Sequence, residues 1–274
     1  MRIAIAGAGD LAKYLVEELL AASHDVVVLS RSPKPWFKRS DISFRKTDYS
    51  IPSLVAALQD CDGLVSALLD YSINSATAHP ALLEACHQTP KCKRFLPSEY
   101  GGNIDVYPES PEFYYANHEP VREALRNQTD VMWTLFNIGW LSDYFVPTSS
   151  QYIRDIDNFH PVNFKTNTMM IPGTGEELIS FTAARDAAKA IAKLIDQNNW
   201  EPTTFVCGKT ATWNSVAKLL AKYGKALEMR YVPLQELQAT IVQGKPGHDD
   251  VIAAQYVEFS LTGGAVLPQE KVEF

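Results

Sequence analysis

A glycine-rich turn between an apolar strand and an amphipathic helix is the feature that most constrains this chain. Arg2–Ala6 is an apolar run of strand length, and Gly7-Ala8-Gly9-Asp10-Leu11-Ala12 follows it directly. Leu11, Leu15 and Leu19 then recur every four residues, as one face of a helix requires. The start of the chain therefore predicts a strand, a tight turn and a helix, which are the first parts of a βαβ unit.

Strands and helices continue to alternate through the first half of the chain. The predicted strands are Val26–Leu29, Ser43–Lys46, Asp62–Leu68 (entered through a turn), Arg94–Leu96 and Val131–Phe136. The predicted helices are Ile51–Gln59, Ser75–His87 with an interruption near Pro80, and a segment that contains Val121–Arg126. This order is typical of an α/β fold with a Rossmann-type, doubly wound parallel sheet.

From about residue 145 the pattern changes, because Pro, Asn and aromatic residues become frequent. Ordered elements then return as Ala183–Ile195 (helix), Thr204–Cys207 (strand), Ser215–Tyr223 (helix), Met229–Val232 (strand) and Leu234–Val242 (helix). We expect a nucleotide-binding domain over residues 1–147 and a smaller C-terminal substrate-binding lobe over 148–274. Within that lobe, residues 176–200 are expected to pack back on the sheet.

Composition excludes several classes of protein. The 274 residues are 46% hydrophobic with a formal net charge of −7, so we expect a folded globular protein without a nucleic-acid partner. No apolar run approaches the ~20 residues that span a bilayer, so we expect no membrane contact. No export signal is visible, which favours a cytoplasmic protein. We expect a monomer or a homodimer. The four cysteines form no CxxC pair, and no His pair has metal-binding spacing, so we expect neither disulfides nor a metal.

The glycine turn also predicts chemistry. Gly7-x-Gly9-x-x-Ala12 lies between a strand and a helix, the context in which this pattern binds dinucleotides. Gly7 permits the tight turn, and Gly9 lets backbone amides approach a pyrophosphate at the positive end of the helix. A turn that merely connects the strand to the helix is the alternative.

The end of the second strand indicates which dinucleotide is bound. An NAD site has an acidic residue at this point, whereas this chain has Ser30-Arg31-Ser32 with Lys34 and Lys38 close behind. Guanidinium and ammonium groups suit a 2′-phosphate, which favours NADP(H). The alternative is an ordinary solvated basic loop.

Further blocks of sequence point to a family. The most specific is Arg94-Phe95-Leu96-Pro97-Ser98-Glu99-Tyr100-Gly101, and the others are Asp48, Phe136-Asn137-x-Gly139-Trp140, Gly173-Thr174-Gly175, Ile179–Thr182 and Arg185-Asp186. Together with Gly7-x-Gly9, they resemble the NmrA-like, isoflavone reductase-like group of atypical short-chain dehydrogenases. Enzymes of that group reduce small, often aromatic or heterocyclic compounds with NADPH, whereas the NmrA regulator binds the nucleotide without reducing anything. The resemblance spans roughly residues 1–200 and assigns nothing beyond about residue 245.

The resemblance implies site residues at the carboxyl ends of the strands, where open α/β sheets bind ligands. The pyrophosphate would contact Gly7, Gly9, Asp10 and Leu11 beside Ala12. The 2′-phosphate would be held by Arg31 and Lys38, near Ser32 and Lys34. The adenosine side would pass along Ser66, Ala67 and Leu68, and the nicotinamide would be framed by Pro97, Ser98, Glu99, Phe136, Asn137 and Ile138.

One position departs from the family. Its reductases have a Lys three residues before a Val-Arg pair; here that pair is Val121-Arg122 and the matching residue is His118. An imidazole exchanges protons near neutral pH, and Tyr114 lies one helical turn earlier, so the spacing resembles the Tyr-x-x-x-Lys of typical short-chain dehydrogenases. Ser98 lies where those enzymes keep a catalytic Ser. We expect His118, Tyr114 and Ser98 to be catalytic; the alternatives are a His that only hydrogen-bonds within its helix and a Tyr that only packs.

Aromatic residues gather around the expected pocket, which suits a planar substrate, although many aromatics simply pack in cores. The cluster comprises Tyr100, Phe113, Tyr114, Tyr115, Phe136, Trp140, Tyr144, Phe145 and Phe159, of which Tyr100, Tyr115, Trp140 and Tyr144 are the expected substrate-binding residues.

Three functions follow from these observations. The first is an NADPH-dependent reductase of a small aromatic or heterocyclic compound in specialised metabolism, with His118 in place of the usual Lys. The second is a non-redox isomerase, cyclase or condensing enzyme that retains NADP(H). The third is an NADP-binding regulator without turnover.

Overall fold

The structure is a computed structural model that describes residues 1–37, 39–69 and 73–269. Lys38, expected to bind the 2′-phosphate, lies outside the described residues.

The first half of the chain forms a six-stranded parallel sheet in the order β3-β2-β1-β4-β5-β6. Its elements are β1 (Arg2–Ala6), α1 (Asp10–Ala21), β2 (Asp25–Ser30), β3 (Ile42–Lys46), α2 (Ile51–Leu58), β4 (Gly63–Ser66), α3 (Ile73–Gln88), β5 (Arg94–Leu96), α4 (Glu112–Arg126) and β6 (Met132–Trp133). The chain crosses over at β1, as in a doubly wound sheet. The predicted Rossmann-type fold is confirmed.

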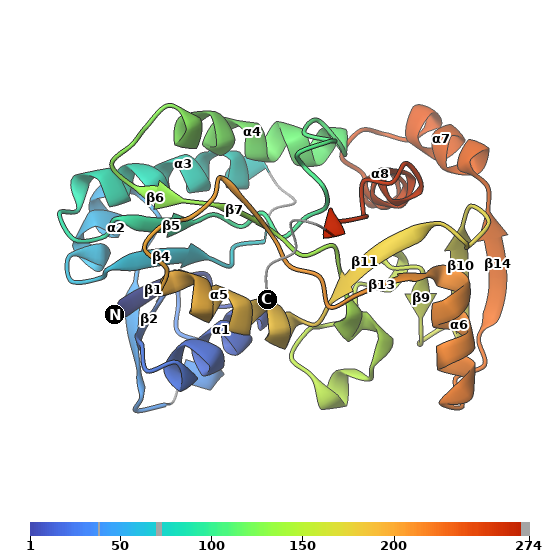
Figure 1. The fold of residues 1–274 in the computed structure, drawn as a ribbon, viewed down its shortest axis with the longest axis horizontal. Coiled ribbons are helices and arrows are strands. Elements are labelled where there is room, and N and C mark those ends of the chain that lie inside the picture. Colours follow the sequence, from blue (N-terminus) through green and yellow to red (C-terminus); the bar gives the residue numbers. More distant parts are fainter. Residues whose placement is uncertain (38, 70–72, 270–274) are drawn as a thin grey trace.

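Two apolar layers cover the sheet, one on each face (Figure 1). On one face α1 packs with α5 (Ala184–Ile195), whose residues Ala187, Ala188 and Ile191 are buried against Ile3 and Leu15. On the other face lie α2, α3 and α4. A strand buried on both faces must be apolar throughout, which explains the uninterrupted Val26–Leu29 run.

The predicted strand Val131–Phe136 is confirmed as extended structure but is wrong as a single strand, because two strands occupy this stretch. β6 closes the large sheet, whereas β7 (Leu135–Asn137) pairs in parallel with β12 (Thr203–Phe205). Thr134 lies between them, and its hydroxyl meets that of Thr204 at 2.8 Å. A short apolar run does not reveal its partner strand, so the division was hidden in the sequence.

The predicted break at Pro80 is also wrong. α3 continues through Pro80, and α4 likewise contains Pro120. A proline inside a helix removes one hydrogen bond. In α3, burial of Leu82, Leu83 and Cys86 against the sheet offsets that loss.

The second half forms a smaller lobe from short strands and helices. Its remaining elements are β8 (Trp140–Leu141), β9 (Val162–Asn163), β10 (Thr168–Pro172), β11 (Leu178–Thr182), β13 (Lys209–Thr212), α6 (Trp213–Lys222), β14 (Glu228–Val232), α7 (Leu234–Gln243) and α8 (Asp249–Leu261), with 3-10 turns at Pro35–Phe37, Ser142–Phe145, Thr148–Ser150 and Asp157–Phe159. A third apolar core lies here around Trp213, which is fully buried.

The tail contains a helix that the sequence pattern did not predict. Besides the buried Val251, Ile252, Ala254 and Phe259 of α8, the apolar Ala253, Tyr256 and Val257 occupy its other side, so no amphipathic stripe is visible. Beyond α8, the carbonyl of Gly264 accepts from the Asn103 amide at 2.7 Å, and that of Ala265 accepts from the Ser180 amide at 2.9 Å. The tail therefore connects the β5–α4 loop to the lobe. Within the described ranges, every helix is too short or too polar to span a membrane.

Candidate cofactor and substrate site

The turn after β1 is built so that only glycine fits at Gly7. Its φ is +106°, and a Cβ there would lie 2.8 Å from the Ala67 carbonyl oxygen. Its amide donates to the Leu29 carbonyl at 3.0 Å. The turn therefore packs closely against the carboxyl ends of both β2 and β4.

Gly9 occupies a contrasting environment. A Cβ at this residue would meet no heavy atom within 4 Å, so the space above it is open. Gly9 is the N-cap of α1, and no side chain caps the helix. The first amides of α1 are therefore available to an anion, as a dinucleotide pyrophosphate requires. Ala12 is fully buried and Leu11 packs against the core beneath.

Asp10 has a second role. Its carboxylate accepts from Arg154 Nε at 2.7 Å and from Lys13 Nζ at 3.2 Å. It therefore connects the start of α1 to the lobe, and the two cations offset a negative charge that would otherwise repel a pyrophosphate.

Arg31, Ser32 and Lys34 are exposed where β2 ends, as a 2′-phosphate site requires. Two aromatic residues that the sequence reading did not single out lie beside them. Trp36 Nε1 faces the Ala8 carbonyl at 3.4 Å, and the Tyr49 hydroxyl donates to the Leu29 carbonyl at 3.1 Å. Burial raises the pKa of Tyr49 to about 12, so its hydroxyl keeps its proton.

The ends of β4 and β5 are joined by side-chain hydroxyls. Tyr100 donates to the Ser66 carbonyl at 2.8 Å, and Ser98 Oγ donates to the Leu68 carbonyl at 2.9 Å. Ser66 Oγ lies 2.9 Å from His79 Nε2. Burial raises the pKa of Tyr100 well above its ordinary value. The hydroxyls of Ser98 and Tyr100, expected in catalysis and substrate binding, thus bond to the backbone of the β4 exit, against Ala67.

A buried ion pair anchors the Pro97-Ser98-Glu99 segment to α4. The Glu99 carboxylate pairs with Arg122 on α4, and both side chains are at most 3% exposed. Arg122 also donates to the Pro108 carbonyl at 2.7 Å. The pair fixes α4, and with it Tyr114 and His118, against the end of β5.

His118 and Tyr114 lie together as their spacing predicts. Their rings stack with centroids 3.7 Å apart. His118 Nδ1 lies 2.7 Å from the Tyr114 carbonyl oxygen, and its Nε2 lies 3.0 Å from that of Ser98. A neutral imidazole donates from one nitrogen only, so a protonated ring satisfies both carbonyls.

The Phe136–Ile138 segment lies beside Tyr114. Together with Ser98, Tyr114 and His118 it forms one wall of the candidate site. Phe136 and Ile138 are core side chains, while Asn137 is buried with Nδ2 donating to the Leu135 carbonyl at 3.1 Å. Gly101 has close neighbours: a Cβ there would lie 3.0 Å from the Tyr114 hydroxyl and 3.5 Å from Asn137 Oδ1. The Tyr114 hydroxyl and the Asn137 amide thus flank the same backbone position.

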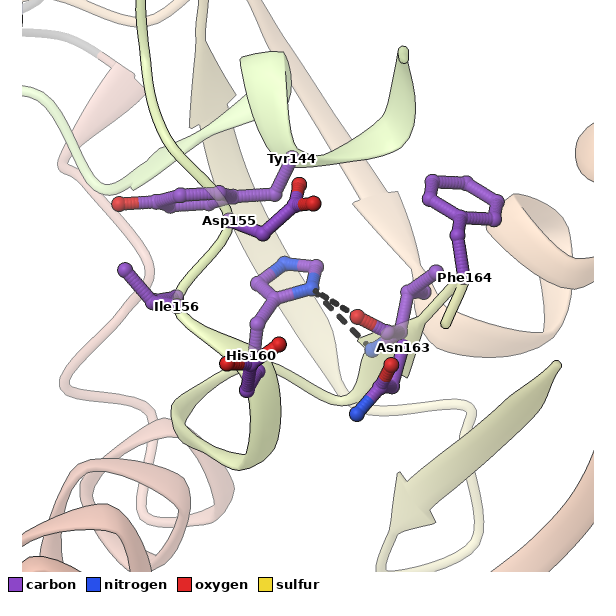
Figure 2. Close-up of a pocket in the computed structure, with 8 residues that line it drawn as sticks. Tyr144, Asp155, Ile156, His160, Asn163 and Phe164 are labelled. Atoms are coloured by element: carbon purple, nitrogen blue, oxygen red, sulfur yellow. Dashed lines mark hydrogen bonds between the residues drawn. The ribbon is translucent and has the colours of Figure 1, made fainter. Parts of the chain in front are cut away.

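Aromatic rings lead from this wall into the lobe. Tyr256, on α8, lies 6.3 Å from Tyr114 and 6.3 Å from Trp140, measured between ring centroids. The Trp140 indole donates to Ser260 Oγ at 3.0 Å, and its ring lies 5.4 Å from that of His160. Tyr144 lines a hollow with His160 (Figure 2), and Tyr115 is half-buried on α4.

Sequence reasoning missed Tyr256 and His160 because neither belongs to a motif. Tyr256 lies in the tail, and His160 lies in a stretch where frequent Pro and Asn residues interrupt any periodic pattern of apolar residues. All four cysteines are free thiols, and the described part of the chain contains no cluster of three or more His, Cys, Asp or Glu side chains that would hold a metal.

Comparison with known proteins gives concordant results. Residues 6–163 match the family described as NAD(P)H-binding. The chain is 46% identical to oxidoreductase swnR of Arthroderma benhamiae over 276 aligned residues, which cover 100% of this chain and 90% of that protein. It is 44% identical, with the same coverage, to oxidoreductase swnR of Metarhizium robertsii. Phenylcoumaran benzylic ether reductase 1 of Arabidopsis thaliana is 24% identical over 88% of this chain and 80% of its own length.

Solved structures share the fold. AtPrR2 with NADP+ and (+)pinoresinol superposes with a TM-score of 0.77 at 21% identity, over 96% of this chain and 88% of that one. The leucoanthocyanidin reductase–NADPH complex from Vitis vinifera also gives 0.77, at 20% identity over 97% and 88% of the two chains.

Proposed function

The chain belongs to the NAD(P)H-binding, isoflavone reductase-like and NmrA-like family of atypical short-chain dehydrogenases and is an oxidoreductase, and on this premise we propose that it reduces a small aromatic or heterocyclic compound of specialised metabolism with NADPH. The open space above Gly9, at the uncapped start of α1, is the observation that carries the proposal. It leaves backbone amides directed at the position a pyrophosphate would take.

The preference for NADPH over NADH is part of the proposal. Arg31, Ser32 and Lys34 offer two cations and a hydroxyl to a 2′-phosphate, and residues 30–34 contain no carboxylate that would compete. Charge-assisted bonds to phosphate are among the strongest polar contacts available at a surface.

NADPH, when bound, supplies a hydride, and the chain must supply the proton. We assign that proton to the Tyr114 hydroxyl. Its ring stacks on that of His118, and the Arg122 guanidinium carbon lies 5.9 Å from the Tyr114 ring centroid. Positive charge on both neighbours stabilises the phenolate that remains after Tyr114 gives up its proton.

In this scheme His118 occupies the position of the family's Lys and supplies the same positive charge. Its protonated ring donates to the carbonyls of Ser98 and Tyr114, so it holds the end of β5 against α4 while it supports the phenolate. Ser98 contributes through its backbone carbonyl in this scheme.

The test follows NADPH absorbance against a panel of aromatic enones and cyclic imines. Tyr114→Phe is expected to lower kcat by roughly 10²- to 10⁴-fold, the usual contribution of a positioned proton donor. His118→Ala is expected to lower kcat at least about tenfold, and His118→Lys to retain most of the activity because it restores a cation. Arg126→Ala, on the exposed side of α4, is the control.

Three outcomes would redirect the proposal. Unchanged turnover in His118→Ala would remove His118 from the reaction. Product formation without NADPH oxidation would favour an isomerase, cyclase or condensing enzyme. Tight NADPH binding without turnover of any compound in the panel would favour a nucleotide-binding regulator.

A further inference from the structure

His160 is a buried histidine enclosed by aromatic rings. It follows the 3-10 turn at Asp157–Phe159 and is 4% exposed. Four rings surround it, with centroids at 4.9 Å (Tyr144), 5.4 Å (Trp140), 5.4 Å (Phe145) and 5.6 Å (Trp213). Apolar walls of this kind strengthen any hydrogen bond made inside them.

The contacts of Nδ1 with Val162 favour one tautomer of His160. The Val162 amide donates to Nδ1 at 3.1 Å, and the Val162 carbonyl oxygen lies farther away, at 3.3 Å. Because a backbone N–H can only donate, we assign the lone pair to Nδ1. Burial lowers the pKa of His160 to about 3, and the ring is therefore neutral at physiological pH. A neutral ring with an unprotonated Nδ1 has its proton on Nε2, which makes Nε2 a donor.

This donor has no acceptor among the described residues. Buried donors are nearly always paired, so an unpaired one calls for an acceptor from outside the chain. The ring borders a hollow of about 10 Å³, room for roughly one water-sized group, that is also lined by Tyr144 and Asp155. Figure 2 shows the dashed contacts of Nδ1, which the distances assign to Val162, on one side of the His160 ring, and the other side of the ring turned toward Tyr144 and Asp155.

A series of ring contacts links His160, at the hollow, with Tyr114. Trp140 packs on His160 on one side and on Tyr256 on the other, and Tyr256 packs on Tyr114. A flat molecule that lies along these rings, with its reacting carbon near Tyr114, would extend its far end toward His160.

We propose that His160 and Asp155 form a subsite for a hydroxyl group at the end of the substrate remote from the reacting carbon. The hydroxyl oxygen accepts from Nε2–H, and the hydroxyl proton is donated to the Asp155 carboxylate. A carboxylate in the same place would be repelled by Asp155, and a methyl group would leave Nε2–H without an acceptor. The inference rests on the proposed function for the direction in which the substrate lies.

The experiment compares 4-hydroxychalcone with 4-methylchalcone, two aromatic enones of nearly equal size that differ in this one group. The holoenzyme with NADPH is titrated with each, and binding is followed by the tryptophan fluorescence of the protein, to which Trp140 and Trp213 beside His160 contribute. Wild type is expected to bind the hydroxylated compound at least tenfold more tightly.

Three variants separate the hydrogen bond from packing. His160→Phe keeps a ring in the aromatic box without a donor and is expected to abolish the preference. His160→Gln restores an amide donor and is expected to recover part of it, and the exposed His248→Ala is expected to leave it unchanged. NADPH affinity should be the same in all of them. Where the compounds are turned over, the effect of His160→Phe should fall on KM rather than kcat.

Three results would overturn the proposal and leave Nε2–H to an ordered water only. They are equal affinity of wild type for the two compounds, an equal loss of affinity for both in His160→Phe, and binding of neither compound. Because binding is read without turnover, a preference that depends on His160 in a protein that never oxidises NADPH would retain the subsite and reject the proposed reduction.

Discussion

At the carboxyl edge of the six-stranded sheet the candidate pyrophosphate contacts are backbone amides, whereas in the hollow around His160 the candidate ligand contacts are side chains. Gly7, Gly9 and the first turn of α1 are consecutive in sequence, and their geometry follows from the turn itself. The hollow instead combines Tyr144 and the 155–164 segment, and Trp140 and Trp213 close around it. The candidate cofactor contacts therefore come from a local motif, and the proposed substrate subsite comes from an assembled surface.

The two regions also differ in whether their buried ionisable side chains carry a charge. At the sheet edge the charge of Glu99 is buried with a partner, Arg122. In the lobe, His160 is buried without a charge, because burial lowers its pKa to about 3. Substitutions in the two regions test this difference.

Removing Arg122 should be the most damaging change. Arg122→Ala leaves the Glu99 carboxylate buried and unpaired, which costs about 3–5 kcal/mol of the free energy of unfolding. Arg126→Ala, one turn later on α4, breaks only an exposed pair with Glu119 and should cost about 1 kcal/mol or less. Urea denaturation measures both; similar losses in the two variants would mean that burial of the first pair has no energetic weight.

The two glycines of the turn should separate stability from binding. Gly7→Ala forces a side chain into positive φ and against the Ala67 carbonyl, so about 1–3 kcal/mol of stability should be lost. Gly9→Ala meets nothing and should fold normally, yet its methyl group enters the space assigned to the pyrophosphate and should weaken NADPH binding at least about tenfold. Thermal melts and calorimetric titration provide the two measurements. Normal NADPH affinity in Gly9→Ala would place the pyrophosphate elsewhere.

Arg31 should determine the choice of dinucleotide. Arg31→Ala removes a charge-assisted contact to the 2′-phosphate, which is expected to weaken NADPH binding roughly tenfold or more while NADH binding changes little. The ratio of the two dissociation constants is the readout. A parallel loss for both dinucleotides would contradict the role given to this side chain.

His160 should make the lobe sensitive to acid. Its pKa is about 3 in the folded state and about 6.5 when unfolded, so the unfolded chain binds the proton first as the pH falls. The contribution of His160 to stability is complete above pH 6.5 and is lost toward pH 3, by about 1.4 kcal/mol per pH unit. Comparing urea midpoints of wild type and His160→Phe at pH 7.5, 5.5 and 4.5 isolates this contribution. Parallel pH profiles would show that His160 is not held neutral.

The sheet could be predicted from sequence because each of its strands carries its own signal. β1 and β5 have the bounds that their apolar runs indicate, and the helices between them differ mainly at their ends. Val131–Phe136 is the exception, because its two halves pair with different strands and pairing is not a local property. α8 was not predicted for a related reason: it is contacted on several sides, so its apolar residues do not form one stripe.

The candidate site divides in the same way. Tyr114 and His118 share a face because of their spacing, yet nothing in the sequence indicated that both His118 nitrogens face backbone carbonyls or that Ser98 and Tyr100 donate to the β4 exit. These bonds join residues that are 4 to 34 positions apart along the chain.

By itself, the sequence determined the doubly wound sheet, the dinucleotide turn and the family, since each depends on neighbouring residues whose spacing sets the backbone path. Only the tertiary structure decided which side chains gather at the proposed substrate site. Tyr256 reaches Tyr114 and Trp140 from the tail, and His160 acquires its tautomer and its unpaired donor from a neighbouring amide and four enclosing rings. Burial and hydrogen-bond partners arise when distant segments pack together, and a linear pattern does not encode that packing.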